Sequence, residues 1–434
     1  MGFSKFVIQV DNGDKTILYD TYKKALVLID SQYIENGNLK DNFPEEYFSA
    51  LEQMGFFISN DEADNIIEQA LAKDRKLIIS VEVALGCNMR CPYCYQGADK
   101  KVKQSLSDNS IDDLVKYCEL TAKKHEFDEV VLKVLGGEPT IAWKTVKKVI
   151  NGVSDFCVVH NKKFRLMIDT NGVLIDDILS LKCYDSLLIT VPLTYKECHD
   201  KMRKLVNGKG SYDTIVANLN RIHRSSSEIT MVLRHNTDIE NIKFFEAYVK
   251  NLRESLEFNP IIDLSYTTEI GEGLYKNELK YEDFIHWKSG EAIDILAAND
   301  CNITVTPLMS ADRCQHRSEF SLKLFSDGTV GSCAMWFFEK NRIKLSDVCE
   351  DPERLKEIKK NEESLYQKCR TCRSFFLCGA GYNLPCIKSL GLENCCMDGA
   401  YNLDVKLFLK KYVQYKKVGK DSLFVGFNNS KAIR

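Results

Sequence analysis

The chain has 434 residues, enough for roughly two or three domains, and 44% of them are hydrophobic against 28% charged. This balance supports a buried core and excludes an intrinsically disordered chain. The formal net charge of −3 comes from acids and bases mixed throughout, so the sequence indicates no basic surface for nucleic acid.

The 17 cysteines are the most informative part of the composition. The start of the sequence shows no signal peptide, and no apolar run reaches the roughly 18 residues of a membrane span. In a cytoplasmic chain, such cysteines indicate metal binding or catalysis rather than disulfides. We therefore expect a cytoplasmic, oxygen-sensitive metalloprotein with neither a membrane nor a nucleic acid as partner.

Residues 1–76 show strand patterns followed by helical ones. Two alternating runs, 6–10 and 16–19, flank an Asp-Asn-Gly-Asp turn and predict a β-hairpin. Residues 25–29 continue as a further strand or as the start of a helix, and a charged helix over 61–73 closes the segment. The order predicts a small, winged-helix-like α+β domain.

Strand and helix patterns alternate from residue 77 to residue 290. The six predicted strands are residues 77–85, 129–135, 164–169, 186–192, 229–235 and 261–267. Serial β–α units predict a parallel sheet with outer helices, in which functional residues lie at the carboxyl ends of the strands.

Three cysteines follow the first of these strands at C-x3-C-x2-C spacing, namely Cys87, Cys91 and Cys94. Three thiolates are too few for the closed tetrahedral shell of structural zinc, and an ordinary [4Fe–4S] cubane also takes four cysteines. The motif therefore indicates a cluster with one iron open to a small ligand. A zinc loop with a distant fourth ligand and three free thiols are the alternatives.

Other motifs stand at the ends of later strands. The sequence GGEP at 136–139 follows the second strand, TNG at 170–172 follows the third, and Arg234 lies near the end of the fifth. Glycines let backbone approach a ligand closely, and a guanidinium suits a carboxylate. A simple glycine turn and a surface ion pair are the alternative interpretations.

The C-terminal third holds a second set of cysteines. Its members are Cys314, Cys333, Cys369, Cys372, Cys378, Cys386, Cys395 and Cys396. A turn at Ser326 would bring the first two together across a hairpin. Taken alone, the C-x2-C pair within this set also fits a zinc knuckle.

Together these motifs resemble the radical S-adenosylmethionine (SAM) enzymes with a C-terminal SPASM domain. The resemblance implies an α/β fold: a partial (β/α)6, TIM-like barrel over 77–295, a winged-helix-like domain over 1–76, and an iron–sulfur SPASM domain over 296–434. It also covers the sequences HDxxR at 199–203 and GxGSY at 208–212, which are common in this subfamily.

The resemblance further implies a reductive cleavage of SAM to a 5′-deoxyadenosyl radical, which removes a hydrogen atom from the substrate. It implies three [4Fe–4S] clusters, one that binds SAM on Cys87, Cys91 and Cys94 and two auxiliary ones on the C-terminal cysteines. The implied SAM contacts are Tyr93, Gly136, Gly137, Glu138, Thr170, Asn171 and Arg234. A flavodoxin or a ferredoxin-type protein is the implied electron donor.

Two places depart from the family pattern. After Cys378 the expected next cysteine is replaced by Tyr382, so either Cys386 serves from a longer loop or the first auxiliary cluster lacks a ligand. Cys301 could complete that cluster or be a core thiol. The fourth strand ends in Thr-Val-Pro-Leu-Thr at 190–194 rather than in a Ser-Ile-Asp-Gly-like turn, and substrate positioning is expected to differ.

The N-terminal domain resembles RiPP recognition elements, which capture the leader of a ribosomally made precursor peptide as an added strand. We therefore favour a peptide maturase that installs a thioether or carbon–carbon crosslink. An anaerobic sulfatase-maturing enzyme, which typically starts almost directly at the barrel, is the second hypothesis, and a non-enzymatic zinc or iron–sulfur protein is the third. Tyr266 and Glu269, near the end of the sixth strand, are the candidate proton acceptors.

Overall fold

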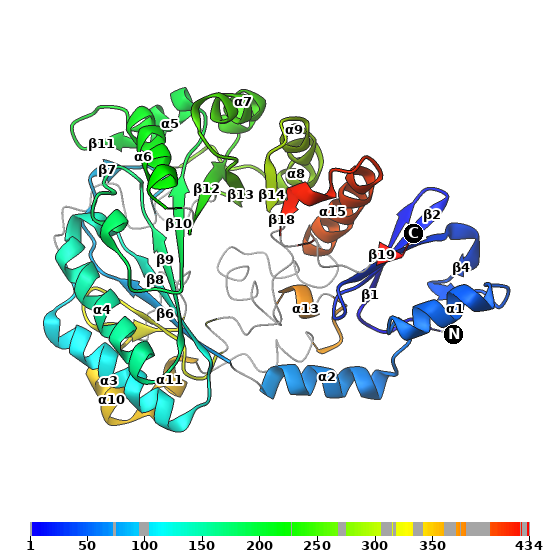
Figure 1. Cartoon of the computed structure of the whole chain (residues 1–434), viewed down its shortest axis with the longest axis horizontal. Coiled ribbons are helices and arrows are strands. Elements are labelled where there is room, and N and C mark those ends of the chain that lie inside the picture. The colour runs from blue at the N-terminus through cyan, green and yellow to red at the C-terminus, as the bar shows by residue number, and fades with distance from the viewer. Residues whose placement is uncertain are drawn as a thin grey trace.

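A computed structural model describes most of the chain. The described residues are 2–72, 75–94, 104–226, 228–267, 275–304, 315, 318–332, 342–359, 370–373, 375–378, 400–425, 427 and 432–433. Figure 1 shows a large curved sheet flanked by helices at one end of the molecule and a small sheet near the N-terminus at the other.

The small sheet contains the predicted hairpin. Its strands β1 (Val7–Asn12), β2 (Lys15–Asp20) and β3 (Ala25–Asp30) are antiparallel neighbours. Gly13 closes the first turn with a φ of +80°, a conformation that favours glycine. Residues 25–29 thus belong to a strand rather than to a helix. The unit is completed by η1 (Ser31–Tyr33), β4 (Ile34–Glu35), β5 (Asn38–Leu39), α1 (Glu45–Gln53) and α2 (Asn60–Ala72).

The two faces of the small sheet pack against different parts of the chain. Val7 and Leu18 pack with Leu51 of α1. On the other face Tyr19 belongs to the main core, and its ring centroid lies 5.5 Å from that of Phe427. The small sheet is therefore fixed to the C-terminal part of the chain by apolar contacts.

A second contact joins the small sheet to the short helix α13 (Phe375–Cys378). The rings of Phe6 and Phe376 meet edge to face, with centroids 5.0 Å apart. The Thr21 hydroxyl donates to the carbonyl of Arg373 at 2.8 Å. The N-terminal module thus touches the stretch that follows Cys372.

A fourth strand of the small sheet comes from the other end of the chain. Strand β19 (Ala432–Ile433) pairs in parallel with β3, with Ala432 opposite Leu26 and Ile433 opposite Val27. Sequence analysis missed this strand, because two residues of pairing leave no periodic pattern.

The large sheet has the strand order β17-β16-β15-β6-β8-β9-β10-β12-β13-β14-β18. Its middle strands are the six predicted ones: β6 (Lys76–Glu82), β8 (Glu129–Leu135), β9 (Lys163–Asp169), β10 (Ser186–Pro192), β12 (Ile229–Thr237) and β13 (Ile261–Tyr266). Neighbours among these six are parallel and follow chain order. Since β17 and β18 end the sheet, it forms an open, partial barrel, and the predicted α/β fold is confirmed.

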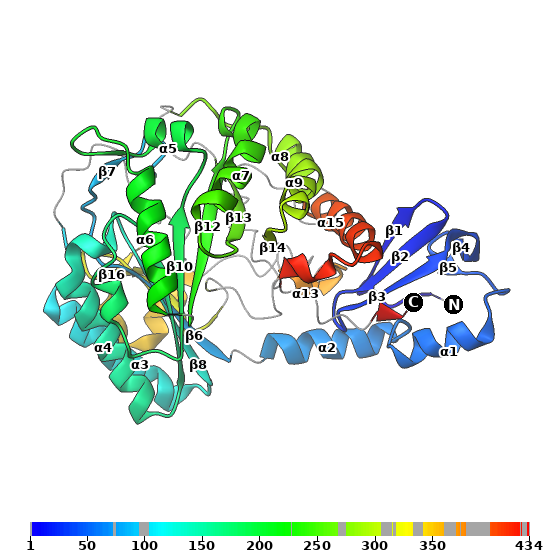
Figure 2. The same cartoon turned by 45° about the horizontal axis from the view of Figure 1, so that its top comes forward.

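Helices connect these strands and cover the outside of the sheet, as the turned view in Figure 2 shows for α3, α4 and α6. They are α3 (Asp108–Lys124), η2 (Pro139–Ala142), α4 (Trp143–Val159), η3 (Ile178–Ser180), α5 (Lys196–Met202), α6 (Tyr212–Ser225), η4 (Asn241–Phe244), α7 (Phe245–Ser255), α8 (Tyr281–Trp287), η5 (Lys288–Ala292) and α9 (Ile293–Ala298). Their buried residues recur every three or four positions, as Ile215, Leu219 and Ile222 do on α6.

The C-terminal elements extend both edges of the barrel sheet. They are β14 (Asn302–Thr304), β15 (Leu322–Leu324), β16 (Thr329–Gly331), β17 (Ile343–Lys344), α10 (Leu345–Glu350), η6 (Pro352–Arg354), α11 (Leu355–Lys359), α15 (Ala400–Lys417), η7 (Asp421–Leu423) and β18 (Phe424–Val425). The predicted turn at Ser326 joins β15 to β16, with Gly328 at a φ of +80°. Among the described residues, no helix is both long and apolar enough to cross a membrane.

We predict that Phe6→Ala loosens the small sheet from the rest of the protein. Phe6 is fully buried, so the truncation leaves a cavity and should cost about 3–5 kcal/mol of stability. Thermal unfolding and limited proteolysis measure the effect, with Tyr47→Ala on α1, 56% exposed, as the aromatic control. Equal losses in both variants would contradict the proposed role of this contact.

Candidate functional site

The predicted motifs meet at one edge of the barrel sheet. The cysteine loop follows β6, the GGEP segment follows β8, and the TNG segment follows β9. These strands are parallel, so their carboxyl ends lie together, and Arg234 lies near the corresponding end of β12. The structure therefore brings together motifs that are spread over about 150 residues of the sequence.

The GGEP segment packs its backbone directly on the cysteine loop. Gly137 N–H donates to Ala84 O and Glu138 N–H donates to Gly86 O, both at 2.8 Å. A Cβ atom on Gly137 would lie 2.3 Å from Gly86 O, and one on Gly136, whose φ is +152°, would lie 2.4 Å from Ala84 O. Both glycines are needed for this close approach of two backbones.

The Glu138 carboxylate joins the GGEP and TNG segments. It is buried, and it accepts hydrogen bonds from the Thr140 N–H at 3.1 Å and the Thr140 hydroxyl at 2.6 Å. From the TNG segment it accepts the Thr170 hydroxyl at 2.7 Å and the Asn171 N–H at 2.6 Å. Burial raises the pKa of Glu138, while these donors lower it. The Glu138 side chain therefore holds the loop after β8 and the loop after β9 together.

Asn171 continues the connection to the cysteine loop. Its side-chain amide donates to Asn88 Oδ1 at 2.6 Å and lies 4.0 Å from Cys87 Sγ. Gly172 beside it has a φ of +79°, and its carbonyl accepts from the Asn218 amide at 2.9 Å. Thr170 and Asn171 are thus within the group of loops that holds the cysteines.

The other side of the cysteine loop is held by residues after α5. Strand β11 (Lys204–Leu205) pairs with β7 (Met89–Arg90) inside the loop, and Val206 N–H donates to Asn88 O at 2.9 Å. The buried guanidinium of Arg203 donates to the Tyr93 hydroxyl at 3.0 Å. Sequence analysis noted Arg203 only as part of HDxxR and did not place it in the site.

The three motif cysteines are half-buried in this setting. Burial raises the pKa of both Cys87 and Cys91, and the charge of Arg203 lowers it. Among the described residues, no three Cys, His, Asp or Glu side chains are grouped to hold a single metal ion. A cubane spreads its thiolates over separate irons, and the three thiols of this loop lie beside a buried cation, which suits thiolate ligands.

Two further predicted residues lie at the carboxyl end of the barrel, already engaged with neighbours. Arg234 Nε donates to Asp263 Oδ2 of β13 at 3.0 Å and is partly buried. The Tyr266 hydroxyl donates to Glu278 Oε1 at 2.7 Å and to Leu279 O at 2.8 Å. Burial, followed by the bond to Glu278, raises the pKa of Tyr266.

Most of the predicted auxiliary ligands lie outside the described residues, as does Glu269. They are Cys314, Cys333, Cys369, Cys386, Cys395 and Cys396. Cys372 is half-buried just before α13, and Cys378 ends that helix. Cys301 is buried beside β14, and burial raises the pKa of its thiol to about 11. The ligand sets of the auxiliary clusters remain predictions.

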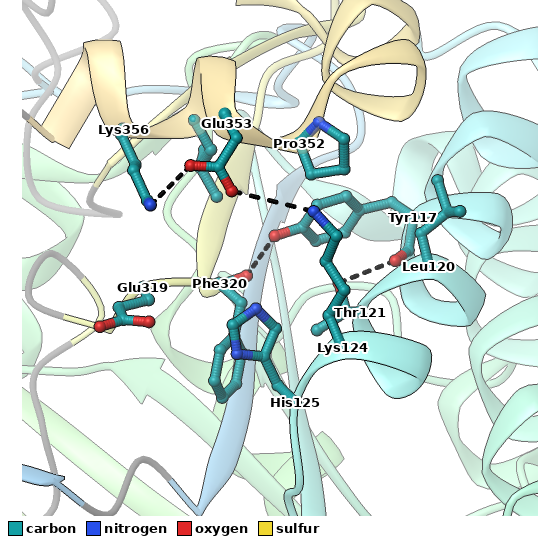
Figure 3. A pocket seen from close by; sticks show the side chains of 11 residues that line it. Tyr117, Leu120, Thr121, Lys124, His125, Glu319, Phe320, Pro352, Glu353 and Lys356 are labelled. Carbon is teal, nitrogen blue, oxygen red and sulfur yellow. Dashed lines mark hydrogen bonds and ion pairs between the residues drawn. The ribbon is translucent and has the colours of Figure 1, made fainter.

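A pocket elsewhere on the barrel, shown in Figure 3, contributes nothing to this site. It lies near the start of β15 and the end of α3, at the amino edge of the sheet, whereas the motifs lie at the carboxyl edge. Glu353 there pairs with Lys356 at 2.6 Å and with Lys124 at 3.8 Å. We assign this pocket no function.

Comparison with known proteins agrees with the geometry of the carboxyl edge. The family model of the radical SAM superfamily matches residues 81–247, from β6 into α7. These residues form a radical SAM domain. The chain thus contains a radical SAM domain, which supports an enzyme, and the family of this domain implies a [4Fe–4S] cluster and SAM as cofactors.

Known proteins are similar to this chain over most of its length. The cysteine-type anaerobic sulfatase-maturating enzyme of Clostridium novyi (strain NT) is 24% identical over 75% of this chain and 92% of its own length. The structure of anSMEcpe with bound AdoMet has a TM-score of 0.59 and 18% identity, and the alignment covers 81% of this chain and 97% of that one. Streptococcus suis SuiB bound to precursor peptide SuiA gives a TM-score of 0.50 and 12% identity over 89% and 96%.

We predict that Gly137→Ala disrupts the cluster loop, because its Cβ would overlap the carbonyl oxygens of Gly86 and Leu85. Cluster affinity should fall roughly 10- to 100-fold, as for other residues that support metal ligands. Iron and sulfide analysis after anaerobic reconstitution measures this. The control is Gly86→Ala in the loop itself, where a Cβ meets nothing within 4 Å. Normal iron in Gly137→Ala would contradict the packing argument.

Proposed function

We propose that this radical SAM enzyme modifies a ribosomally made precursor peptide and installs a thioether or carbon–carbon crosslink. The observation that carries the proposal is the N-terminal module: three strands of the small sheet with two following helices, docked beside Cys372 and α13. A module of this order and size suits capture of a peptide as an added strand.

An anaerobic sulfatase-maturing activity is the second candidate, favoured by the relative from Clostridium novyi. The share of this chain that each structural alignment covers supports the peptide-crosslinking function. The anSMEcpe alignment spans 97% of that chain but 81% of this one, so this chain has residues beyond the shared fold. The alignment with SuiB, whose structure contains a precursor peptide, spans 89% of this chain.

The cysteine loop would hold the catalytic cluster through Cys87, Cys91 and Cys94. When bound, the cluster and SAM supply a 5′-deoxyadenosyl radical that abstracts a hydrogen atom from the substrate. In our proposal Tyr93, the GGEP backbone and the TNG segment line the SAM site. Arg234, whose Nε donates to Asp263, would face the SAM carboxylate.

We also propose two auxiliary [4Fe–4S] clusters in the C-terminal part. The predicted hairpin turn between β15 and β16 supports the first, and the position of Cys372 and Cys378 at either side of the α13 segment supports the second. A flavodoxin or ferredoxin-type protein would donate the electron. Tyr266 and Glu269 stay the candidate proton acceptors, although the Tyr266 hydroxyl donates a hydrogen bond to Glu278 here.

The cluster content tests the cofactor assignment. We predict about twelve irons per chain in the reconstituted wild type and about eight in the Cys87/Cys91/Cys94→Ala triple variant, which should also lose SAM cleavage. Anaerobic iron and sulfide analysis gives the counts, and chromatography of 5′-deoxyadenosine gives the cleavage. Four or fewer irons with stoichiometric zinc in the wild type would overturn the auxiliary clusters. Mass spectrometry of a precursor peptide and of a sulfatase peptide after turnover separates the two candidate functions.

The proposed binding of a leader peptide by the small sheet can be tested at the edge of strand β3. Since β19 occupies that edge, a leader strand joining β3 must replace it. We predict that a chain ending at Phe427 binds a leader peptide several-fold more tightly. Without β19, the β3 edge is open to the leader in all of the molecules rather than in a fraction of them. Fluorescence anisotropy measures this with a labelled leader from a small open reading frame beside the gene, against a scrambled peptide. Unchanged or weaker binding would place the leader elsewhere.

A further inference from the structure

Arg203 is a buried cation in an unusual position. Its side chain follows α5 and is 7% exposed, and its Nε has no hydrogen-bond partner among the described residues. Within the same part of the chain, no carboxylate forms an ion pair with it. Burying an arginine without a carboxylate is costly, so such a residue calls for another anion.

The groups that face this cation belong to the cysteine loop. Arg203 Nη1 donates to the Tyr93 hydroxyl at 3.0 Å. Tyr93 stands between Cys91 and Cys94, so this hydrogen bond holds the guanidinium beside the thiols proposed to bind the cluster.

The backbone of Arg203 is hydrogen-bonded on both sides. Its N–H donates to His199 O at 2.7 Å, and its carbonyl accepts from the Ser211 hydroxyl at 3.1 Å. Asp200 Oδ1 accepts from the Ser211 N–H at 2.7 Å, which ties α5 to the start of α6. Strand β11 then pairs with the cysteine loop itself. The HDxxR segment is thus attached to α6 and is followed by a strand that pairs with the cysteine loop, which fixes the position of Arg203.

We propose that Arg203 is the buried counter-charge of the SAM-binding cluster and a positioning residue that sets its reduction potential. The proposal rests on the radical SAM assignment and deepens it. Three thiolates leave a cubane with net negative charge, and uptake of one electron from a flavodoxin- or ferredoxin-type donor adds another negative charge. A fixed cation in a dry site stabilises the reduced form more than the oxidised form and so raises the potential.

Arg90, the other arginine of the loop, serves a different purpose. Its Nη1 donates to the carbonyls of Cys87 at 3.0 Å and of Met89 at 2.8 Å, so it braces the backbone. It is also more exposed than Arg203, and solvent screens its charge. Arg203 is therefore the better placed of the two to act on the cluster.

The experiment is a redox titration of the full-length, reconstituted enzyme followed by electron paramagnetic resonance. The signal of the SAM-binding cluster is identified by its change on adding SAM and by its loss in the Cys87/Cys91/Cys94→Ala variant. The test variants are Arg203→Met and Arg203→Lys. The matched control is Lys196→Met at the start of α5, where the side chain is 45% exposed and pairs with Asp213 at 2.7 Å.

Arg203→Met should shift the potential to more negative values with iron unchanged, while Arg203→Lys and the control stay near wild type. Loss of cluster iron in Arg203→Met together with a wild-type potential in Arg203→Lys supports the same conclusion. A wild-type potential in Arg203→Met, or loss of iron in both variants, would overturn it.

Tyr93→Phe separates the charge from the hydrogen bond, because it removes the hydroxyl and leaves the guanidinium. A shift as large as that of Arg203→Met would show that Tyr93 rather than the charge sets the potential, and would overturn the proposal. If wild-type enzyme shows no SAM-responsive signal at all, the failure lies in the radical SAM function and not in the role of Arg203.

Discussion

The buried carboxylate of Glu138 is the interaction on which the rest of the site depends. It accepts four hydrogen bonds from two loops that follow neighbouring strands, and those loops in turn carry the bonds to Ala84, Gly86 and Asn88. An anion buried this deeply is stable only when its donors are in place. The cysteine loop therefore has its position fixed by the protein before any ligand arrives, which reduces the ordering cost of binding.

Opposite charges lie on the two flanks of the cysteine loop. Glu138 supports it from the β8 and β9 side, and Arg203 faces it from the α5 side. Each is buried, and each belongs to a segment that does not carry the cysteines. In a low-dielectric site such fixed charges act strongly on a charged group between them, so the surrounding loops would influence any cluster that the thiols bind.

The strands and the motif positions followed from sequence because they depend on local patterns. All six barrel strands were predicted to within a few residues, and the hairpin followed from its Asn-Gly turn. Arg203 was not placed in the site, since a buried arginine and a surface one look alike in sequence. The use of Gly136 and Gly137 to pack backbone on backbone also required coordinates. The ligands of the auxiliary clusters depend on long-range pairing of cysteines, which spacing leaves open.

The joining of β3 to β19 has a consequence for how the chain is made. The two strands lie about 400 residues apart in sequence, yet they are neighbours in one small sheet, and Phe427 packs on Tyr19 of that sheet. During synthesis the N-terminal strands leave the ribosome long before their last partner exists. The small sheet can therefore reach its four-stranded form only after residues 432–433 have emerged, which is later than the barrel strands that lie between them and β3 in the sequence.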